Sequence, residues 1–353
     1  MKFSETIHAA KSKNVSWINN LRLIGMFAVV VLHTASPLLF NYKTVPLGNW
    51  MAADVYNATV RFAVPVFVMI TGALLLGKDY ELGDFLKKRL GRLLLPFLFW
   101  SLVYVGYQWY EEIIYFNGGI LGNINLVLHQ LKIGSSYHLW YVYLLVGLYL
   151  IIPIISKFVR NASEKELLYF LAIWVITILI SSPYLTRFET AVELRYFSGY
   201  IGYLVLGYYL ANKQFNFPGV AFIAVLVFIC FAIIITIGTY YLEVRTNELS
   251  TYFYEPVGPF VVMLSASAFL IAKNVRVKIA PKLERILANA GKFTLGIYFV
   301  HALILNILVL NGVSYAIFNP WLSIPLVALL CFVISWLLIW LMSKVPVLKH
   351  LTG

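Results

Sequence analysis

The chain has little charge for its length. Only 12% of its 353 residues are charged, whereas 61% are hydrophobic, and the mean hydropathy is +0.83. Soluble domains carry roughly twice that fraction of charged residues, and a soluble globule of this composition would expose more apolar surface than it could hide. The low charge therefore excludes a soluble enzyme, a disordered chain and a nucleic-acid-binding domain, and it predicts a polytopic membrane protein.

Cysteine and metal-ligand spacings are also scarce. The two cysteines, Cys230 and Cys331, both lie inside apolar runs, as is typical of small buried hydrophobic residues. The six histidines show neither the H-x-x-x-H spacing nor a Cys-His spacing of a zinc site. We therefore expect no disulfide and no bound metal.

What the chain does have is a series of apolar runs near 20 residues in length. Such runs favour helical spans over the short alternating strands of a barrel. We predict an all-helical membrane protein that forms one domain over residues 1–353, with about ten spans. The longest connection, near 113–136, is too short for a soluble domain. The predicted spans are roughly 18–40, 54–77, 93–112, 137–158, 166–183, 196–212, 218–241, 256–272, 288–310 and 321–342.

The basic residues predict the orientation of these spans. With the N-terminus inside, 19 of the 27 Lys and Arg residues fall in inner segments and 5 in outer segments, and the other three lie within or at the edge of spans. An excess of Lys and Arg marks cytoplasmic loops, so both termini are predicted in the cytoplasm. The net charge of +12 then favours contact with anionic membrane lipid. The basic residues are scattered between apolar runs, which argues against nucleic acid as a partner. The five outer residues are Lys43, Lys132, Arg187, Arg195 and Arg245.

Arg22 and His33 form the most informative pair of ionisable residues. An ionisable side chain within a span is costly, by roughly 2.5–3.5 kcal/mol for a charge at the helix centre, and is a functional candidate. An offset of eleven residues is within about 20° of three helical turns, so the two side chains share a face about 16 Å apart along the axis. A cation near the cytoplasmic end of the span could bind a donor substrate, and an imidazole deep in the span could act where the donor meets an acceptor. The structural alternative is that Arg22 reaches lipid headgroups and that His33 hydrogen-bonds a neighbouring helix.

Arg89 and Arg92 begin the third predicted span after a run of basic residues. Side chains three residues apart lie on one side of a helix, and two guanidinium groups there would suit phosphate through bidentate hydrogen bonds. For the neighbouring Lys87 and Lys88, we favour the simpler interpretation that they mark the cytoplasmic side.

Four further candidates lie near the fourth and ninth predicted spans. His138 and Trp140 fall in an aromatic stretch, which is ordinary at a membrane interface, although the histidine is less so. Tyr298 and His301 are three residues apart and share a helix face. The structural alternatives are interface anchoring for Trp140 and a satisfied interhelical donor for His301.

Several of these residues stand in longer motifs. Arg22-x(10)-His33, Arg61-Phe62-Ala63-Val64-Pro65-Val66-Phe67, and Lys88-Arg89-Leu90-Gly91-Arg92 resemble the integral-membrane acyltransferase-3 family, and the similarity runs from about Trp17 to Met342. His138-Leu139-Trp140-Tyr141 and Gly296-Ile297-Tyr298-x-x-His301 are similar to its branch of surface-polysaccharide O-acetyltransferases, which includes the enzyme for enterobacterial common antigen. Many members have an acidic residue where this chain has Asn19, and a serine where it has Thr71.

The resemblance implies ten core spans in a bacterial inner membrane, an acyl-coenzyme A donor and a carbohydrate hydroxyl as acceptor, on a surface polysaccharide or its lipid-linked precursor. Arg89, Arg92, Arg61 and Arg22 would then contact the donor, most simply acetyl-coenzyme A, although a succinyl group stays open. His33 would act as general base, since imidazole titrates near pH 6.5, or would carry the acyl group as an acyl-histidine. His138, Trp140, Tyr298 and His301 would lie on the acceptor side.

Two other functions remain open on the residues alone. A transporter or flippase of a lipid-linked sugar or small anion would also have about ten spans and charges within them, although we find no internal repeat. A scaffold for polysaccharide assembly is the third interpretation, and unlike an enzyme it would survive loss of His33. The acceptor sugar and the oligomeric state, including a homo-oligomer, are not fixed by the sequence.

Overall fold

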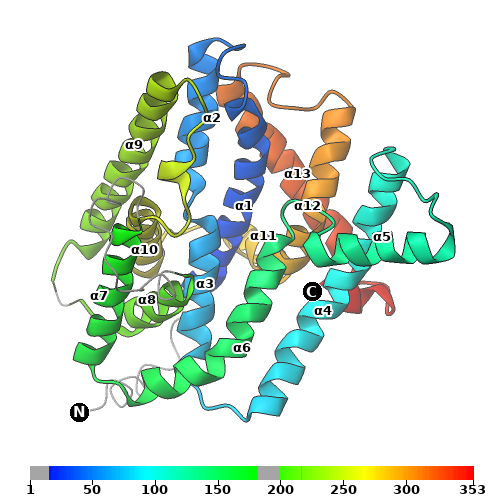
Figure 1. The fold of residues 1–353 in the computed structure, drawn as a ribbon. Helices are drawn as coiled ribbons and strands as arrows, with labels where there is room; N and C mark the ends of the chain where they lie inside the picture. The colour runs from blue at the N-terminus through cyan, green and yellow to red at the C-terminus, as the bar shows by residue number, and fades with distance from the viewer. Residues whose placement is uncertain (1–15, 182–198, 216) are drawn as a thin grey trace. The chain divides into compact units, whose positions relative to one another are not determined.

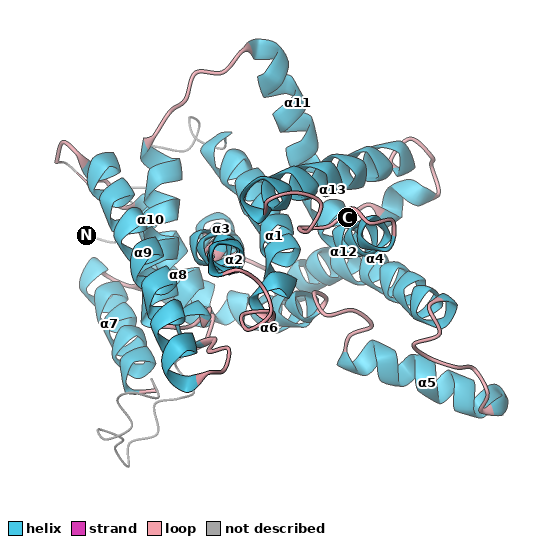
Figure 2. Cartoon of the chain, turned by 90° about the horizontal axis from the view of Figure 1, so that it is seen from above, coloured by secondary structure: helices cyan, strands magenta, loops and turns pink. Residues whose placement is uncertain are grey.

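A computed structural model of the protein describes residues 16–181, 199–215 and 217–353 (Figure 1). These residues form helices joined by turns and loops, and the described part contains no β-strand (Figure 2), so the all-helical prediction is confirmed. Lys2, Lys11, Lys13, Arg187 and Arg195, which entered the charge count, lie outside the described residues.

The described residues group into two compact units. Unit 1 holds the chain up to Asp79 together with residues 154–291 and 312–330, and unit 2 holds residues 80–153, 292–311 and 331–353. The helices of unit 1 are α1 Ser16–Leu39, α2 Leu47–Val60, α3 Ala63–Leu75, α7 Glu164–Ile180, α8 Ile201–Asn212, α9 Val220–Thr246, η4 Tyr252–Tyr254, α10 Pro259–Asn274 and α11 Pro281–Lys292. Unit 2 contains α4 Leu82–Tyr110, α5 Gly119–Ile133, α12 Thr294–Leu310 and η5 Leu348–Leu351. Two helices, α6 Trp140–Asn161 and α13 Pro320–Met342, contribute residues to both units.

Seven helical segments in the described residues are long and apolar enough to cross a membrane, and an eighth is present if α11 and α12, which meet at a bend of 80°, count as one span. The predicted spans 166–183 and 196–212 correspond to α7, with 17 residues, and α8, with 12. A span needs about 20 residues, so these two fall short by length, and the count of ten stays a prediction. The cytoplasmic location of both termini also stays a prediction.

Two segments are more helical than the sequence indicated. α4 begins at Leu82 rather than near 93, because the Glu81 side chain accepts hydrogen bonds from the backbone N–H groups of Gly83 and Asp84 and caps the helix. These hydrogen bonds also hold the pKa of Glu81 below its usual range. The predicted connection near 113–136 contains α5. Its apolar side chains, such as Ile120 and Leu121, are exposed in the structure.

The span from Leu47 to Leu75 is interrupted at Arg61. The backbone leaves helical hydrogen bonding at Arg61 and Phe62, between α2 and α3. Proline has no N–H, so Pro65 cannot donate to the carbonyl of Arg61 four residues earlier. The sequence thus places a charged residue at the one break of this span.

Glycines allow α3 and α8 to approach each other closely. A Cβ on Gly72 would lie 1.9 Å from the carbonyl oxygen of Leu204, and a Cβ on Gly207 would lie 2.1 Å from that of Met69. Small residues at such crossings let helix backbones touch in a membrane. Gly72 and Gly207 therefore fix the closest helix crossing of unit 1.

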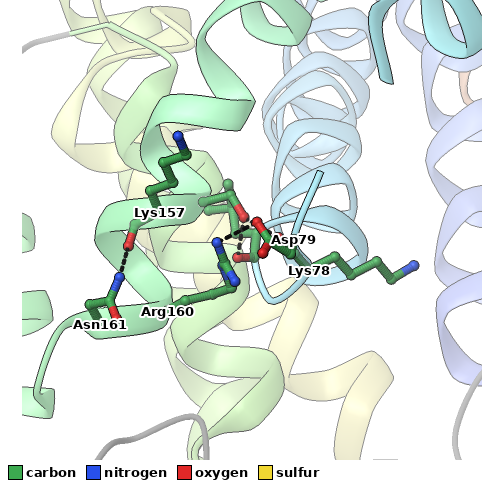
Figure 3. Close-up of polar contacts among 7 residues, drawn as sticks. Lys78, Asp79, Lys157, Arg160 and Asn161 are labelled. Atoms are coloured by element: carbon green, nitrogen blue, oxygen red, sulfur yellow. Dashed lines mark hydrogen bonds and ion pairs between the residues drawn. The ribbon is translucent and has the colours of Figure 1, made fainter. Parts of the chain in front are cut away.

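Segments that the charge count assigns to one side of the membrane meet in unit 1. Figure 3 shows Arg160 pointing to Asp79, at 2.6 Å, while Lys78 and Lys157 point away from this pair. Lys213 pairs with Glu164, and the Lys273 ammonium donates to the carbonyl of Lys213 at 2.7 Å. The side of the membrane on which these helix ends lie stays a prediction.

Two connections that the charge count assigns to the outer side of the membrane also contact each other. The Asn41 side chain donates to the Tyr315 hydroxyl at 3.3 Å, and the Trp321 ring N–H donates to the carbonyl of Gly48 at 3.1 Å. The connections near 40–46 and 311–320 therefore lie at one end of unit 1.

Candidate functional site

Arg22 and His33 both lie on α1, which is continuous from Ser16 to Leu39. The unbroken helix gives the geometry expected from their offset, with both side chains on one face and three turns between them. Both residues are half-buried. Arg22 Nη1 lies 3.5 Å from Asn19 Oδ1, so the residue that replaces the family's acidic residue contacts the guanidinium as a neutral amide.

α1 packs against α2 and α3, which run beside it in Figure 2. The Trp50 ring N–H donates to the carbonyl of Leu39 at 3.0 Å, and Ser36 Oγ donates to Asn57 Oδ1 at 3.0 Å. Because residue numbers rise on one helix as they fall on the other, α1 and α2 are antiparallel. His33 is one turn before Ser36 and Arg61 one turn after Asn57, so His33 and Arg61 lie at the same level of this helix pair.

Arg61 is held by neutral groups. Its Nη2 donates to Asn57 Oδ1 at 3.1 Å, and its guanidinium carbon lies 4.2 Å from the centre of the Tyr254 ring. The second contact is a cation–π interaction. The resemblance predicted a donor-binding role for Arg61, which stays a prediction. The structure places Arg61 at the end of α2 and at the level of His33 in this helix pair.

Asp54 lies on the same side of α2 as Arg61, two turns earlier. Its side chain has 0% exposure and accepts a hydrogen bond from the Tyr254 hydroxyl. We call Asp54, Asn57, Arg61 and Tyr254 the Arg61 network. Asp54 and Tyr254 were not among the predicted site residues. The seven-residue spacing of Asp54 and Arg61 on one helix face could have linked those two.

Unit 2 brings three of the predicted residues together. The Tyr298 hydroxyl donates to the carbonyl of His138 at 2.5 Å, and the rings of His138 and His301 have centroids 4.9 Å apart. His301 Nδ1 lies 2.7 Å from the carbonyl of Tyr298. Because a carbonyl only accepts, Nδ1 of His301 carries a proton, and Nε2 is the acceptor nitrogen of the neutral ring. We call His138, Tyr298 and His301 the histidine cluster.

The histidine cluster is enclosed by aromatic rings from other helices. The Tyr104 ring lies 5.2 Å from that of His138, and the Tyr104 hydroxyl donates to the carbonyl of Phe299 at 2.8 Å. The thiol of Cys331 donates to the carbonyl of His301 at 3.3 Å. Cys331 is buried as its apolar setting predicted, whereas Cys230 is exposed and the same prediction is wrong for it. Tyr104 and Cys331 were not among the predicted site residues. Both side chains hydrogen-bond to backbone carbonyls of α12 and stabilise this part of the helix.

The other candidates of unit 2 lie at its accessible surface. Trp140 is 43% exposed. Arg89 is half-buried with its guanidinium 5.9 Å from the centre of the Phe85 ring, and Arg92 is exposed. Arg22, His33 and Arg61 thus belong to unit 1, whereas Arg89, Arg92, His138, Trp140, Tyr298 and His301 belong to unit 2.

Within the described ranges, no three His, Cys, Asp or Glu residues are grouped so that they could hold a metal ion.

Comparison with protein families identifies the class. A family model described as an acyltransferase domain matches residues 15–340, which is nearly the whole chain. The protein belongs to this acyltransferase-3 family and, given its apolar helices, is a multi-pass membrane acyltransferase. No curated protein and no solved structure matches the chain.

Proposed function

We propose that the protein is an O-acyltransferase that moves an acyl group, in the first instance acetyl, from acyl-coenzyme A to a carbohydrate hydroxyl. The acceptor would be a surface polysaccharide or its lipid-linked precursor, at the inner membrane of a bacterium. The observation that carries the proposal is the half-buried His33 on the face of α1 that also bears Arg22, in a chain of this family. The resemblance of the His138 and Tyr298 motifs to surface-polysaccharide O-acetyltransferases supports the carbohydrate acceptor.

In this reaction, His33 acts as the general base. It takes the proton of the acceptor hydroxyl while the oxygen attacks the thioester carbonyl carbon. The tetrahedral intermediate then collapses, the carbon–sulfur bond breaks, and the imidazolium returns its proton to the departing thiolate of coenzyme A. A half-buried base also limits the access of water, which would otherwise hydrolyse the thioester.

The donor and the acceptor use different residues. Arg89 and Arg92, which lie one turn apart on α4, would bind coenzyme A phosphates. The exposed ring of Trp140 has the area to stack on a sugar, and the histidine cluster supplies hydrogen-bonding groups nearby in unit 2. Family membership favours this transfer reaction over transport, and no contact in the described residues favours a transporter.

The test uses purified protein and acetyl-coenzyme A carrying a labelled acetyl group. We expect release of free coenzyme A thiol, and label on the glycan when membranes that contain the natural acceptor are added. In parallel, the surface glycans of cells with and without the gene are compared by mass spectrometry, and we expect acetyl groups only in the first. Equal acetylation in both, with no thiol release by the purified protein, would exclude this function.

A further inference from the structure

Arg61 is a cation within a membrane span that the fold does not neutralise. A guanidinium inside a span is costly and is normally paired or functional. In the described residues, the ion pairs within 4.0 Å are Arg160 with Asp79 and Lys213 with Glu164, and neither includes Arg61. Arg61 Nε is buried and has no hydrogen-bond partner in the structure.

The nearby carboxyl group is occupied elsewhere. Asp54 lies two turns away on the same face of α2, where it could pair with Arg61, but it accepts the hydrogen bond of the Tyr254 hydroxyl. The Tyr254 ring meanwhile lies against the guanidinium of Arg61. One tyrosine thus holds the cation with its ring and donates its hydroxyl to Asp54 Oδ1. Among the described residues, Asp54 Oδ2 has no hydrogen-bond partner, and the carboxyl group forms no ion pair with Arg61.

The position of this charge indicates its use. Arg61 and His33 lie at the same level of the antiparallel pair α1 and α2, through the Ser36–Asn57 and Asn57–Arg61 hydrogen bonds. When the acceptor hydroxyl attacks the thioester with the help of His33, the thioester carbonyl oxygen becomes an oxyanion. A preorganised donor at that point stabilises the transition state, typically by about 10²–10³ in kcat.

We propose that Arg61 stabilises the oxyanion of acyl transfer at His33, and that Asn57, Tyr254 and Asp54 position it. This inference rests on the proposed function. In the step, the acceptor oxygen bonds to the thioester carbon, its proton moves to His33, and the carbonyl electron pair becomes the oxyanion that Arg61 holds. The pair returns as the carbon–sulfur bond breaks, and the thiolate takes the proton. Tyr254, Asn57 and Asp54 are positioning residues because they act through Arg61.

An anionic oxygen at Arg61 could also belong to a phosphate of the donor, and kinetics separate the two sources. An oxyanion exists only in the transition state, so Arg61→Gln should lower kcat by about 10²–10³ and leave the KM for acetyl-coenzyme A within about twofold. A phosphate is present in the bound donor, so its loss would raise KM while kcat persists.

The positioning role has its own test, which uses the two functions of Tyr254. Tyr254→Phe keeps the ring but removes the cap on Asp54, so the carboxylate can turn to Arg61 and neutralise it. We expect kcat to fall about tenfold, since about 1.4 kcal/mol corresponds to a factor of ten. Adding Asp54→Asn to Tyr254→Phe removes the competing charge and should restore most of kcat. The control is Tyr169→Phe on α7, whose side chain is largely exposed.

The outcomes are distinct. If the wild-type protein releases no thiol from acetyl-coenzyme A, the proposed function fails. If the wild type is active but Arg61→Gln changes only KM, the charge serves a phosphate and the oxyanion role is wrong. If Arg61→Gln does not fold, the kcat of Tyr254→Phe, with and without Asp54→Asn, tests the proposal instead. A double variant that is less active than Tyr254→Phe would show a structural network and overturn the positioning role.

A second and independent observation concerns α11. Leu283, Ile286, Leu287 and Ala290 fall on one face of this helix, and the basic residues on the opposite one. Leu283 is 46% and Ile286 is 40% exposed, whereas Leu287 is half-buried and Ala290 is buried, so only the part of the apolar face near Leu283 and Ile286 is uncovered by protein. The segment from 273 to 292, which begins on α10 and continues through the connection seen in Figure 2, is strongly basic. Its six basic residues, against the single acid Glu284, are Lys273, Arg276, Lys278, Lys282, Arg285 and Lys292.

We infer that α11 lies in the membrane interface and binds anionic lipid headgroups. A basic helix with one uncovered apolar face inserts that face at the level of the acyl chains and places its cations among the headgroups. The charge complementarity favours phosphatidylglycerol or another anionic lipid over a neutral one.

The purified protein in mixed phosphatidylglycerol and phosphatidylcholine micelles tests this inference. Mass spectrometry of the retained lipid should show a preference for phosphatidylglycerol, and Lys282→Gln with Arg285→Gln should reduce that preference at least twofold. The matched control, Lys132→Gln with Arg245→Gln, removes the same charge from other helices and should keep it. Equal preference in both double variants would overturn the inference.

Discussion

The Arg61 network of unit 1 and the histidine cluster of unit 2 both bury polar groups, but they satisfy them differently. In the Arg61 network, a guanidinium contacts an amide and a phenol ring, while the carboxyl group is capped by a hydroxyl. In the histidine cluster, Tyr298 and His301 bond to backbone carbonyls that precede or lie within a helix. These hydrogen bonds join uncharged groups to carbonyls, whereas the network holds a guanidinium.

The two sites therefore differ in charge. The Arg61 network retains a guanidinium, whereas the side chains of Tyr298 and His301 hydrogen-bond to the backbone. A buried charge without an ion-pair partner destabilises the fold, so its retention in unit 1 points to chemistry. The histidine cluster costs the fold little, because its members are neutral and hydrogen-bonded. We therefore expect the reacting groups in unit 1 and recognition or support in unit 2.

The largest expected effect separates His33 from His301. His33→Gln keeps hydrogen bonding but cannot take a proton near neutrality, so turnover of acetyl-coenzyme A should fall by about 10²–10⁴. His301→Gln should lower kcat less than about tenfold. His129→Gln, on an exposed position of α5, is the control. Turnover is normalised to folded protein by size-exclusion profile, and near-normal turnover of His33→Gln would reverse the comparison.

The stability of unit 1 depends on its closest helix crossing. Gly207→Ala places a Cβ 2.1 Å from the carbonyl oxygen of Met69, and such overpacking costs about 1–3 kcal/mol. We expect a lower melting temperature of the purified protein in detergent. Gly106→Ala on α4, where a Cβ meets nothing within 4 Å, should leave it unchanged or raise it slightly. Equal melting temperatures would show that α3 and α8 can separate without cost.

A smaller effect should appear in unit 2 at the basic start of α4. Arg89→Ala removes a charge-assisted hydrogen bond to phosphate, worth about 1.5–3 kcal/mol, so the KM for acetyl-coenzyme A should rise by about ten- to a hundredfold with kcat preserved. Arg92→Ala should behave alike, and Lys87→Ala should stay within twofold. Unchanged KM in both arginine variants would move the phosphate site elsewhere.

The smallest effect concerns the ion pair of Glu164 with Lys213. Hydrogen bonds from Lys213 and Tyr209 hold the pKa of Glu164 below its usual range. The pair therefore stabilises the fold above the ordinary carboxyl pKa of about 4.3, and this contribution is lost as the pH falls through the lowered pKa. Because the pair is exposed, Glu164→Gln should lower the melting temperature by less than about 2 °C at pH 7. The difference from wild type should vanish near pH 3, and a constant difference would contradict it.

Much of the fold could be predicted from the sequence because apolar runs and loop charges are local signals. The helices α1, α9 and α13 coincide with predicted spans within a few residues. The first three turns of α4, which follow the cap at Glu81, were missed because they carry polar and basic residues. α5 was missed because its 15 residues are fewer than a span needs. The lengths of α7 and α8 leave the span count at seven or eight by length and composition.

The candidate site also has parts that the sequence predicts and parts that it does not. Arg22 and His33 share a face because they share a helix, and Tyr298 and His301 do so for the same reason, so spacing alone predicts both pairs. The contact of Tyr254 with Asp54 joins residues 200 positions apart, and that of His138 with His301 joins the turn before α6 to α12. Composition determined that this chain forms membrane helices, and the loop charges predict how they alternate. Only tertiary packing decided which polar groups contact one another, because these contacts depend on helix register. The packing places Arg61 without an ion-pair partner among the described residues at the level of His33.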